Sequence, residues 1–153
     1  MTGGRVKRIQ EFTEGKPFLL TYGDGVSDVN IKELLELHKQ RKKICTVTAV
    51  PPPGRFGILD INSQGFVDRF IEKPQNNQTY INGGFFVCEP EVFKYIEDDA
   101  TIFEKEPLEN LASKNQLNSY IHSGFWKPMD TIRDKIILEE LWKKNKAPWK
   151  IWK

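Results

Sequence analysis

The chain has 153 residues, of which 39% are hydrophobic and 29% are charged, and its formal net charge is +2. These values are typical of one soluble globular domain over 1–153, and the scattered basic residues argue against a nucleic-acid surface. No apolar stretch approaches the roughly 20 residues that cross a membrane, and the N-terminus lacks a signal-peptide core, so we expect a cytoplasmic protein.

The first third of the chain predicts a strand–helix–strand unit. The apolar run at 17–22 is bounded by Pro and Gly, which indicates a buried strand. Either Asp28 or Asn30 can cap a helix over 31–42, whose apolar positions follow helical spacing and whose last turn is basic. The β-branched segment 44–50 predicts a second buried strand. This order is typical of a right-handed parallel unit.

The rest of the chain predicts a hairpin followed by alternating strands and helices. The expected elements are a hairpin of 56–61 and 66–71, a strand at 80–88, helices at 90–97 and 104–113, a strand at 117–122 and a helix at 130–144. The end of the chain, 147–152, is aromatic and is expected to pack on this domain or on a partner subunit.

Four residues with reactive side chains lack a catalytic or metal-binding pattern. Cys45 and Cys88 each lie in an apolar run without metal-ligand spacing, which favours two buried thiols over a disulfide or a metal pair. His38 lies on the apolar side of its helix and is expected in the core. No nucleophile motif accompanies His122, so a hydrolase triad is rejected.

Asp24 follows the first predicted strand, at the edge where open α/β sheets bind ligands. Gly23 and Gly25 flank it and let the backbone approach a phosphate or a sugar closely. The alternative is an aspartate that only stabilises a turn or caps the next helix.

Asp130 lies between Pro128 and a predicted helix, so it is either a plain N-cap or a carboxylate held still by its cap position. If the fold brings Asp24 and Asp130 together, they form a two-carboxylate seat for Mg²⁺ that also binds substrate phosphates. Such a seat points to phosphoryl or nucleotidyl chemistry.

Further candidates surround these two carboxylates in the sequence. Glu72 and Lys73 close the hairpin and either bind a sugar hydroxyl and a phosphate or form a solvated strand end. Asn82 and Gly83 interrupt a strand, which indicates either close approach of a ligand or a β-bulge. Trp126 either stacks on a sugar or fills the core.

Seven segments in order closely resemble the glucose-1-phosphate cytidylyltransferases, within the sugar-nucleotide pyrophosphorylase family. They are 2–5 (TGGR), 18–28 (FLLTYGDGVSD), 52–60 (PPGRFGILD), 72–74 (EKP), 81–87 (INGGFFV), 125–135 (FWKPMDTIRDK) and 146–150 (KAPWK). The likeness runs from Thr2 to the C-terminus.

The resemblance implies an α/β, Rossmann-like nucleotide-diphospho-sugar transferase fold with a mixed, mainly parallel sheet. It also implies an enzyme that makes CDP-glucose and pyrophosphate from CTP and α-glucose 1-phosphate with Mg²⁺, for surface polysaccharide. On the matching positions, the resemblance makes Asp24, Lys73 and Asp130 catalytic, with both aspartates as metal ligands. It assigns substrate contacts to Arg5, Gly57, Glu72, Lys73, Asn82 and Gly83, to which Trp126 is added as a candidate for stacking on the sugar.

Part of the family's sequence pattern is missing from this chain. Family members open with a glycine-rich phosphate loop and a further catalytic lysine, and neither pattern occurs in this sequence. We therefore expect the C-terminal part of such an enzyme, N-terminally truncated, with weak or no turnover and with open sheet edges that favour a homo-oligomer. The alternatives are a noncatalytic module for sugar-phosphate binding or subunit assembly, and a uridylyl- or thymidylyltransferase.

Overall fold

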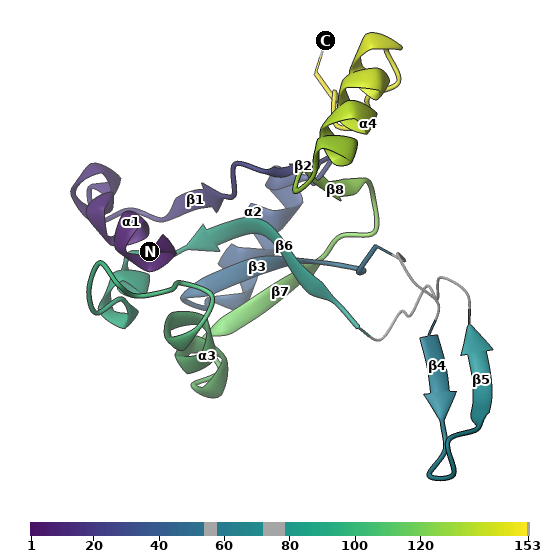
Figure 1. Cartoon of the computed structure of the whole chain (residues 1–153). Coiled ribbons are helices and arrows are strands. Elements are labelled where there is room, and N and C mark those ends of the chain that lie inside the picture. Colours follow the sequence, from purple (N-terminus) through teal and green to yellow (C-terminus); the bar gives the residue numbers. More distant parts are fainter. Residues whose placement is uncertain (54–57, 72–78, 153) are drawn as a thin grey trace.

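The computed structural model describes residues 1–53, 58–71 and 79–152, and a four-stranded sheet lies at its centre (Figure 1). Strand β6 (Ile81–Cys88) pairs antiparallel with β1 (Phe18–Thr21) on one side and with β3 (Cys45–Val50) on the other. The far edge of β3 pairs parallel with β7 (Leu117–Ile121). The sheet is mixed, as predicted, and β1, β3 and β7 run in one direction. Because β6 lies between β1 and β3, two of the three pairs in this described sheet are antiparallel, so the expected parallel pairing of 17–22 with 44–50 is not found.

The burial of these strands follows their place in the sheet. The prediction of a buried strand at 44–50 is confirmed, because β3 has a neighbour on both sides and only Val47 along it is partly exposed. The same prediction for 17–22 is wrong in its burial: β1 is an edge strand, and Leu19 is 51% exposed. An edge strand covered on one face buries alternate residues only.

Helices lie beside the sheet and at both ends of the chain (Figure 1). Helix α2 (Ile31–Arg41) begins at Asn30, whose Oδ1 accepts hydrogen bonds from the N–H groups of Lys32 and Glu33. The cap is therefore Asn30 and not Asp28. The other helical elements are α1 (Thr2–Arg8), η1 (Gln10–Thr13), η2 (Pro90–Tyr95), α3 (Glu106–Ser113) and α4 (Ile132–Lys143).

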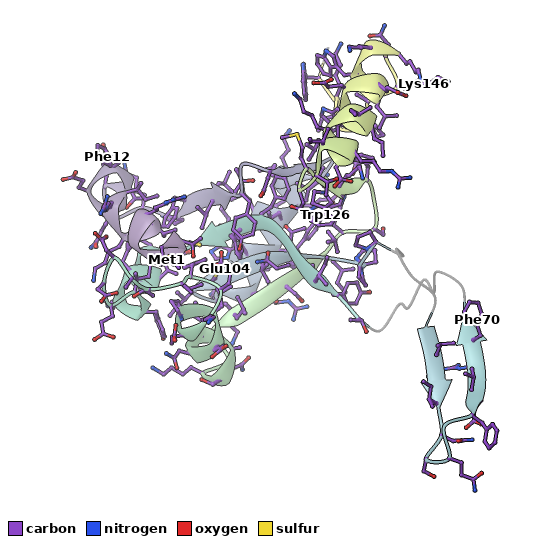
Figure 2. All side chains as sticks on the ribbon, in the orientation of Figure 1. Met1, Phe12, Phe70, Glu104, Trp126 and Lys146 are labelled. Carbon is purple, nitrogen blue, oxygen red and sulfur yellow. The ribbon has the colours of Figure 1, made fainter. Side chains whose placement is uncertain are left out.

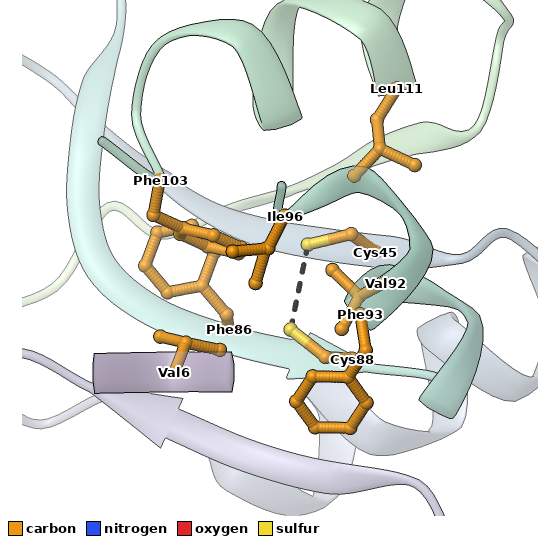
Figure 3. Close-up of a cluster of buried hydrophobic side chains, with 9 residues drawn as sticks. All are labelled: Val6, Cys45, Phe86, Cys88, Val92, Phe93, Ile96, Phe103 and Leu111. Atoms are coloured by element: carbon orange, nitrogen blue, oxygen red, sulfur yellow. Dashed lines mark hydrogen bonds between the residues drawn. The ribbon is translucent and has the colours of Figure 1, made fainter. Parts of the chain in front are cut away.

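The segment predicted as a helix at 90–97 forms the short 3₁₀ helix η2 instead. Its tighter winding brings Val92 and Phe93 into the core directly after β6 ends. The core combines β3, β6, η2 and α3 with Val6 of α1 (Figure 3), and Phe86 meets Phe103 edge-to-face at 5.7 Å between ring centroids.

The two cysteines face each other inside this core. Cys45 and Cys88 are directly opposite in the β3–β6 pair, fully buried, with their sulfur atoms 3.8 Å apart (Figure 3). They are free thiols, as predicted. His38 is also buried, with Nδ1 2.8 Å from Thr46 Oγ1, which confirms its predicted place in the core.

Two smaller strand pairs complete the structure. The predicted hairpin forms from β4 (Ile58–Ile61) and β5 (Val67–Ile71) and lies apart from the main sheet in Figure 1. The second pair, β2 (Gly25–Ser27) with β8 (Trp126–Pro128), is antiparallel and is called the ribbon below.

The aromatic end of the chain packs on the domain itself. The ring of Trp149 lies 5.4 Å from that of Phe125, and Trp152 lies 6.5 Å from Trp142 of α4. Among the described residues, none of the helices combines the length and the apolar character that a membrane crossing requires.

Candidate functional site

The ribbon brings Asp24 and Asp130 together from distant parts of the sequence. Asp24 precedes β2, Asp130 follows β8, and the strands are in register with Gly25 opposite Pro128. The N–H of Met129 donates to the carbonyl oxygen of Asp24 at 2.7 Å, which closes this end of the ribbon. Both residues line one cavity of about 320 Å³ and are exposed to solvent.

The capping alternative for Asp130 does not hold. The cap of α4 is Thr131, which forms a capping box with Asp134: the Thr131 hydroxyl accepts from the Asp134 N–H, and the Asp134 carboxylate accepts from the Thr131 N–H. The cap thereby holds the backbone next to Asp130. Asn30 likewise replaces Asp24 as the cap of α2.

Lys127 of β8 also bonds to the first turn of α4. Its Nζ donates to Asp134 Oδ1 at 2.6 Å, and both side chains are largely buried. The hydrogen bonds from Lys127 and Thr131 lower the pKa of Asp134 to about 2. Asp134 is thus an anion that joins β8, which precedes Asp130, to the first turn of α4, which follows it.

Trp126 and Gly83 form another wall of this cavity. The indole Nε1–H of Trp126, the first residue of β8, donates to the carbonyl oxygen of Gly83 at 2.8 Å, so the ring is held against β6 (Trp126 is labelled in Figure 2). Asn82 is exposed; its Nδ2 donates to the Tyr22 hydroxyl, and its Oδ1 accepts from the N–H of Gly84.

A second cavity, of about 480 Å³, lies on the other side of Tyr22. Tyr22 and Asp24 line both cavities, and the second also contains Arg5 and Glu104. The two cavities therefore share the wall that Tyr22 and Asp24 form. Arg5 is exposed on α1 and belongs to this second cavity.

Tyr22 and Glu104 are site residues that the sequence analysis missed. The Tyr22 hydroxyl donates to Glu104 Oε1 at 2.6 Å, and the Thr2 hydroxyl donates to Glu104 Oε2 at 2.7 Å. Burial and the bond to Glu104 raise the pKa of Tyr22. The Tyr22 ring packs against Gly84, whose φ is +77° and where a Cβ would lie 2.6 Å from the ring. The position of Tyr22 next to the Gly-Asp-Gly motif could have indicated its role in the site. The sequence around Glu104 contains no comparable motif.

Three predicted residues, Gly57, Glu72 and Lys73, lie outside the described residues. Within the described part of the chain, no three His, Cys, Asp or Glu side chains gather as a metal site. Two exposed carboxylates at a cavity nevertheless fit Mg²⁺, which takes one or two protein carboxylates and completes its shell with water and phosphate oxygens.

His122 does not form a triad with its neighbours Ser27 and Asp28. Ser27 Oγ and Asp28 Oδ1 lie 3.2 and 2.9 Å away, but both approach the same ring nitrogen, Nε2. A triad requires the acid and the nucleophile at opposite nitrogens. The rejection of a hydrolase is therefore consistent with this geometry.

Comparison with known proteins gives one consistent family. The chain is 54% identical over 153 residues to glucose-1-phosphate cytidylyltransferase of Salmonella typhimurium, covering 99% of this chain and 59% of that protein. It is 31% identical over 140 residues to mannose-1-phosphate guanyltransferase of Saccharomyces cerevisiae, covering 87% of this chain and 39% of that protein. The chain thus spans about three fifths or less of these relatives.

A solved structure shares the fold. HddC from Yersinia pseudotuberculosis superposes with a TM-score of 0.66 at 20% identity, over 92% of this chain and 62% of that one. Residues 3–138 match the family described as nucleotidyl transferase. With nearly the whole chain matched and two carboxylates at one cavity, the chain belongs to the nucleotidyl transferase family.

Proposed function

We propose that this chain carries the sugar-phosphate and metal half of an enzyme that makes CDP-glucose and pyrophosphate from CTP and α-glucose 1-phosphate. The observation that carries the proposal is the convergence of Asp24 and Asp130 on one cavity. In the reaction, a phosphate oxygen of the sugar phosphate attacks the α-phosphorus of CTP. The bond from that phosphorus to the bridging oxygen breaks, and pyrophosphate leaves.

The two cavities suggest where each substrate binds. The sugar phosphate fits the smaller cavity, beside Trp126 and the backbone of Gly83, and the nucleotide phosphates fit the larger one near Arg5. Asp24 lies where the two cavities meet, so its carboxylate faces the position of phosphoryl transfer. The chain then acts by holding both substrates in line and by excluding other orientations.

The metal proposed for this site is Mg²⁺, held by the carboxylates of Asp24 and Asp130. When bound, it neutralises charge on the phosphate oxygens. We further propose that Lys73 binds the sugar phosphate and that Gly57, Glu72 and Asn82 contact the sugar. CTP is proposed because the relative at 54% identity is named a cytidylyltransferase. The cytoplasm is the proposed compartment because CTP is available there.

We also propose that the chain self-associates. Leu19 on the edge strand β1 is 51% exposed, and Ile132 and Ile136 on α4 are 79% and 49% exposed. Exposed edges and apolar helix residues of this kind favour pairing with another chain. Sedimentation velocity over a dilution series tests this, and a single monomeric species at all concentrations would contradict it.

The proposed function is tested by isothermal titration of α-glucose 1-phosphate and then CDP-glucose into the chain with Mg²⁺. Asp24→Asn and Asp130→Asn keep the side-chain size, and we expect each to weaken CDP-glucose binding by at least about tenfold, because one of two metal ligands loses its charge. Glu140→Gln, on the exposed part of α4, is the matched control. Equal binding by wild type and both aspartate variants, or no binding of either ligand, would refute the proposal.

A further inference from the structure

The end of the ribbon opposite the two aspartates is closed by a cluster of polar groups. His122 Nε2 lies 3.2 Å from Ser27 Oγ, 3.2 Å from the carbonyl oxygen of Phe125 and 2.9 Å from Asp28 Oδ1. The Ser27 hydroxyl donates to the Phe125 carbonyl at 2.8 Å, and the N–H of Asp28 donates to the same oxygen at 3.2 Å. One imidazole thus contacts the last residue of β2 and the residue that precedes β8. We call Ser27, Asp28, His122 and Phe125 the histidine cluster.

The histidine cluster is buried and attached to the main sheet. His122 is 7% exposed and directly follows β7, and its N–H donates to the carbonyl oxygen of Ala49 in β3 at 2.9 Å. Its backbone therefore belongs to the sheet, while its side chain reaches the ribbon. This residue is a direct link between the rigid sheet and the strands that present Asp24 and Asp130.

Hydrogen-bond accounting assigns the proton on the ring. The Ser27 hydroxyl uses its hydrogen for Phe125, so its oxygen can only accept from His122. All three groups around Nε2 are oxygens, which requires Nε2 to carry a hydrogen. The Asp28 Oδ1 atom is buried and makes no well-aligned hydrogen bond, so its contact with the ring is mainly electrostatic.

The space beside position 124 is filled by the cluster itself. A Cβ at position 124 would lie 2.5 Å from Asp28 Oδ1 and 2.7 Å from His122 Cε1. Gly124 therefore permits the close approach of the imidazole and the carboxylate. Any larger residue would require the Asp28 or the His122 side chain to shift.

We propose that His122 is a positioning residue: through the histidine cluster it sets the register of the ribbon and so the separation of Asp24 and Asp130. Each strand of the ribbon has only three residues, and a two-stranded ribbon is marginally stable in water without outside support. The histidine cluster supplies that support at one end, and the bond from Met129 to Asp24 follows at the other. The link to metal binding rests on the proposed function; the link to ribbon geometry does not.

Amide hydrogen exchange tests the geometric part without any ligand. In His122→Phe and Gly124→Ala, we expect the Met129 amide to exchange at least about tenfold faster, while the Glu89 amide, bonded to Ile44 beside the β3–β6 pair, keeps its protection. His122→Gln, whose amide can donate from a place near Nε2, should restore most of the protection.

The chain offers a matched control for loss of a buried imidazole, since it has one other histidine, His38, which is also buried. His38→Gln should lower the overall stability without a selective loss of amide protection at Met129. Ser27→Ala is the milder variant if His122→Phe does not fold. Unchanged Met129 exchange in Ser27→Ala and Gly124→Ala, or equal acceleration at Met129 and Glu89, would overturn the proposal.

The functional part is measured with Mn²⁺ as the probe, by electron paramagnetic resonance in the presence of CDP-glucose. We expect His122→Phe to weaken Mn²⁺ binding by about 10- to 100-fold, as for other residues that orient metal ligands, and His122→Gln to recover it. Wild-type chain that binds no Mn²⁺ would refute the proposed function and leave the exchange result to decide the positioning role. Tight Mn²⁺ binding by both wild type and His122→Phe would overturn the positioning role.

Discussion

Replacing Tyr22 by Phe removes one oxygen from the wall between the two cavities. That hydroxyl donates to Glu104 Oε1 at 2.6 Å and accepts from Asn82 Nδ2 at 2.9 Å. The ring itself should stay, because it packs against Phe86 with 5.6 Å between centroids. The substitution therefore tests the hydrogen bonds alone.

The expected loss of stability follows from the charge on Glu104. A hydrogen bond to a charged group contributes about 1.5–3 kcal/mol. Glu104 is half-buried and keeps its bond from Thr2, so we expect about 2 kcal/mol, toward the low end of that range. For a chain of this size, this corresponds to a fall in Tm of about 4–8 °C.

The loss should depend on pH. Burial acts to raise the pKa of Glu104, but the hydrogen bonds from Tyr22 and Thr2 outweigh it and lower that pKa. A lowered pKa in the folded state means that the stabilisation is complete above the unfolded value of about 4.3 and is lost as the pH falls through the folded value. Near pH 3 the Tyr22→Phe effect should shrink toward that of a neutral hydrogen bond, about 1 kcal/mol.

Urea unfolding followed by tryptophan fluorescence, at pH 7 and pH 3, gives the two free energies. Tyr80→Phe removes a hydroxyl from a side chain that is 40% exposed and is the control, with little expected effect at either pH. A Tyr22→Phe loss as large at pH 3 as at pH 7, or no larger than that of Tyr80→Phe, would refute the reasoning.

Three further outcomes are expected. Lys127→Met should raise the pKa of Asp134 from about 2 toward the ordinary 3.9, seen in carboxyl-carbon NMR titration, and an unmoved pKa would contradict the role of Lys127. Cys45 and Cys88 should resist a thiol reagent in the native chain and both react in urea, because their mutual contact and burial raise the pKa of Cys88; rapid native labelling would oppose this. Leu34→Ala should cost about 2–5 kcal/mol in urea unfolding because the side chain is fully buried, and a loss below about 1 kcal/mol would contradict it.

Local patterns predicted much of the fold. The β-branched run became β3, the helical spacing after Asn30 became α2, and the segments 56–61 and 66–71 gave the hairpin of β4 and β5. In each case the determining residues are neighbours in the sequence. The buried thiols and the core position of His38 followed from the same kind of reasoning.

Features that depend on distant pairing were not predicted. Nothing near residues 17–22 indicates that β6 lies beside that strand or that β1 is an edge. The Tyr22–Glu104 bond joins residues 82 positions apart, and the His122–Ser27 contact joins residues 95 apart. The sequence predicted a shared site for Asp24 and Asp130 only if the fold brings them together. It is the register of β2 with β8 that places both residues at one cavity.

The ribbon also has a consequence for how the chain matures on the ribosome. Ser27 bonds to the carbonyl of Phe125, a residue made 98 positions later. The first half of the chain can collapse earlier, but the seat for the two aspartates is incomplete until the residues around Asp130 have emerged. Contacts of such long range form slowly. In a nascent chain stalled before residue 125, β2 would therefore lack its partner β8, and Asp24 and Asp130 could share a cavity only after β8 has been made.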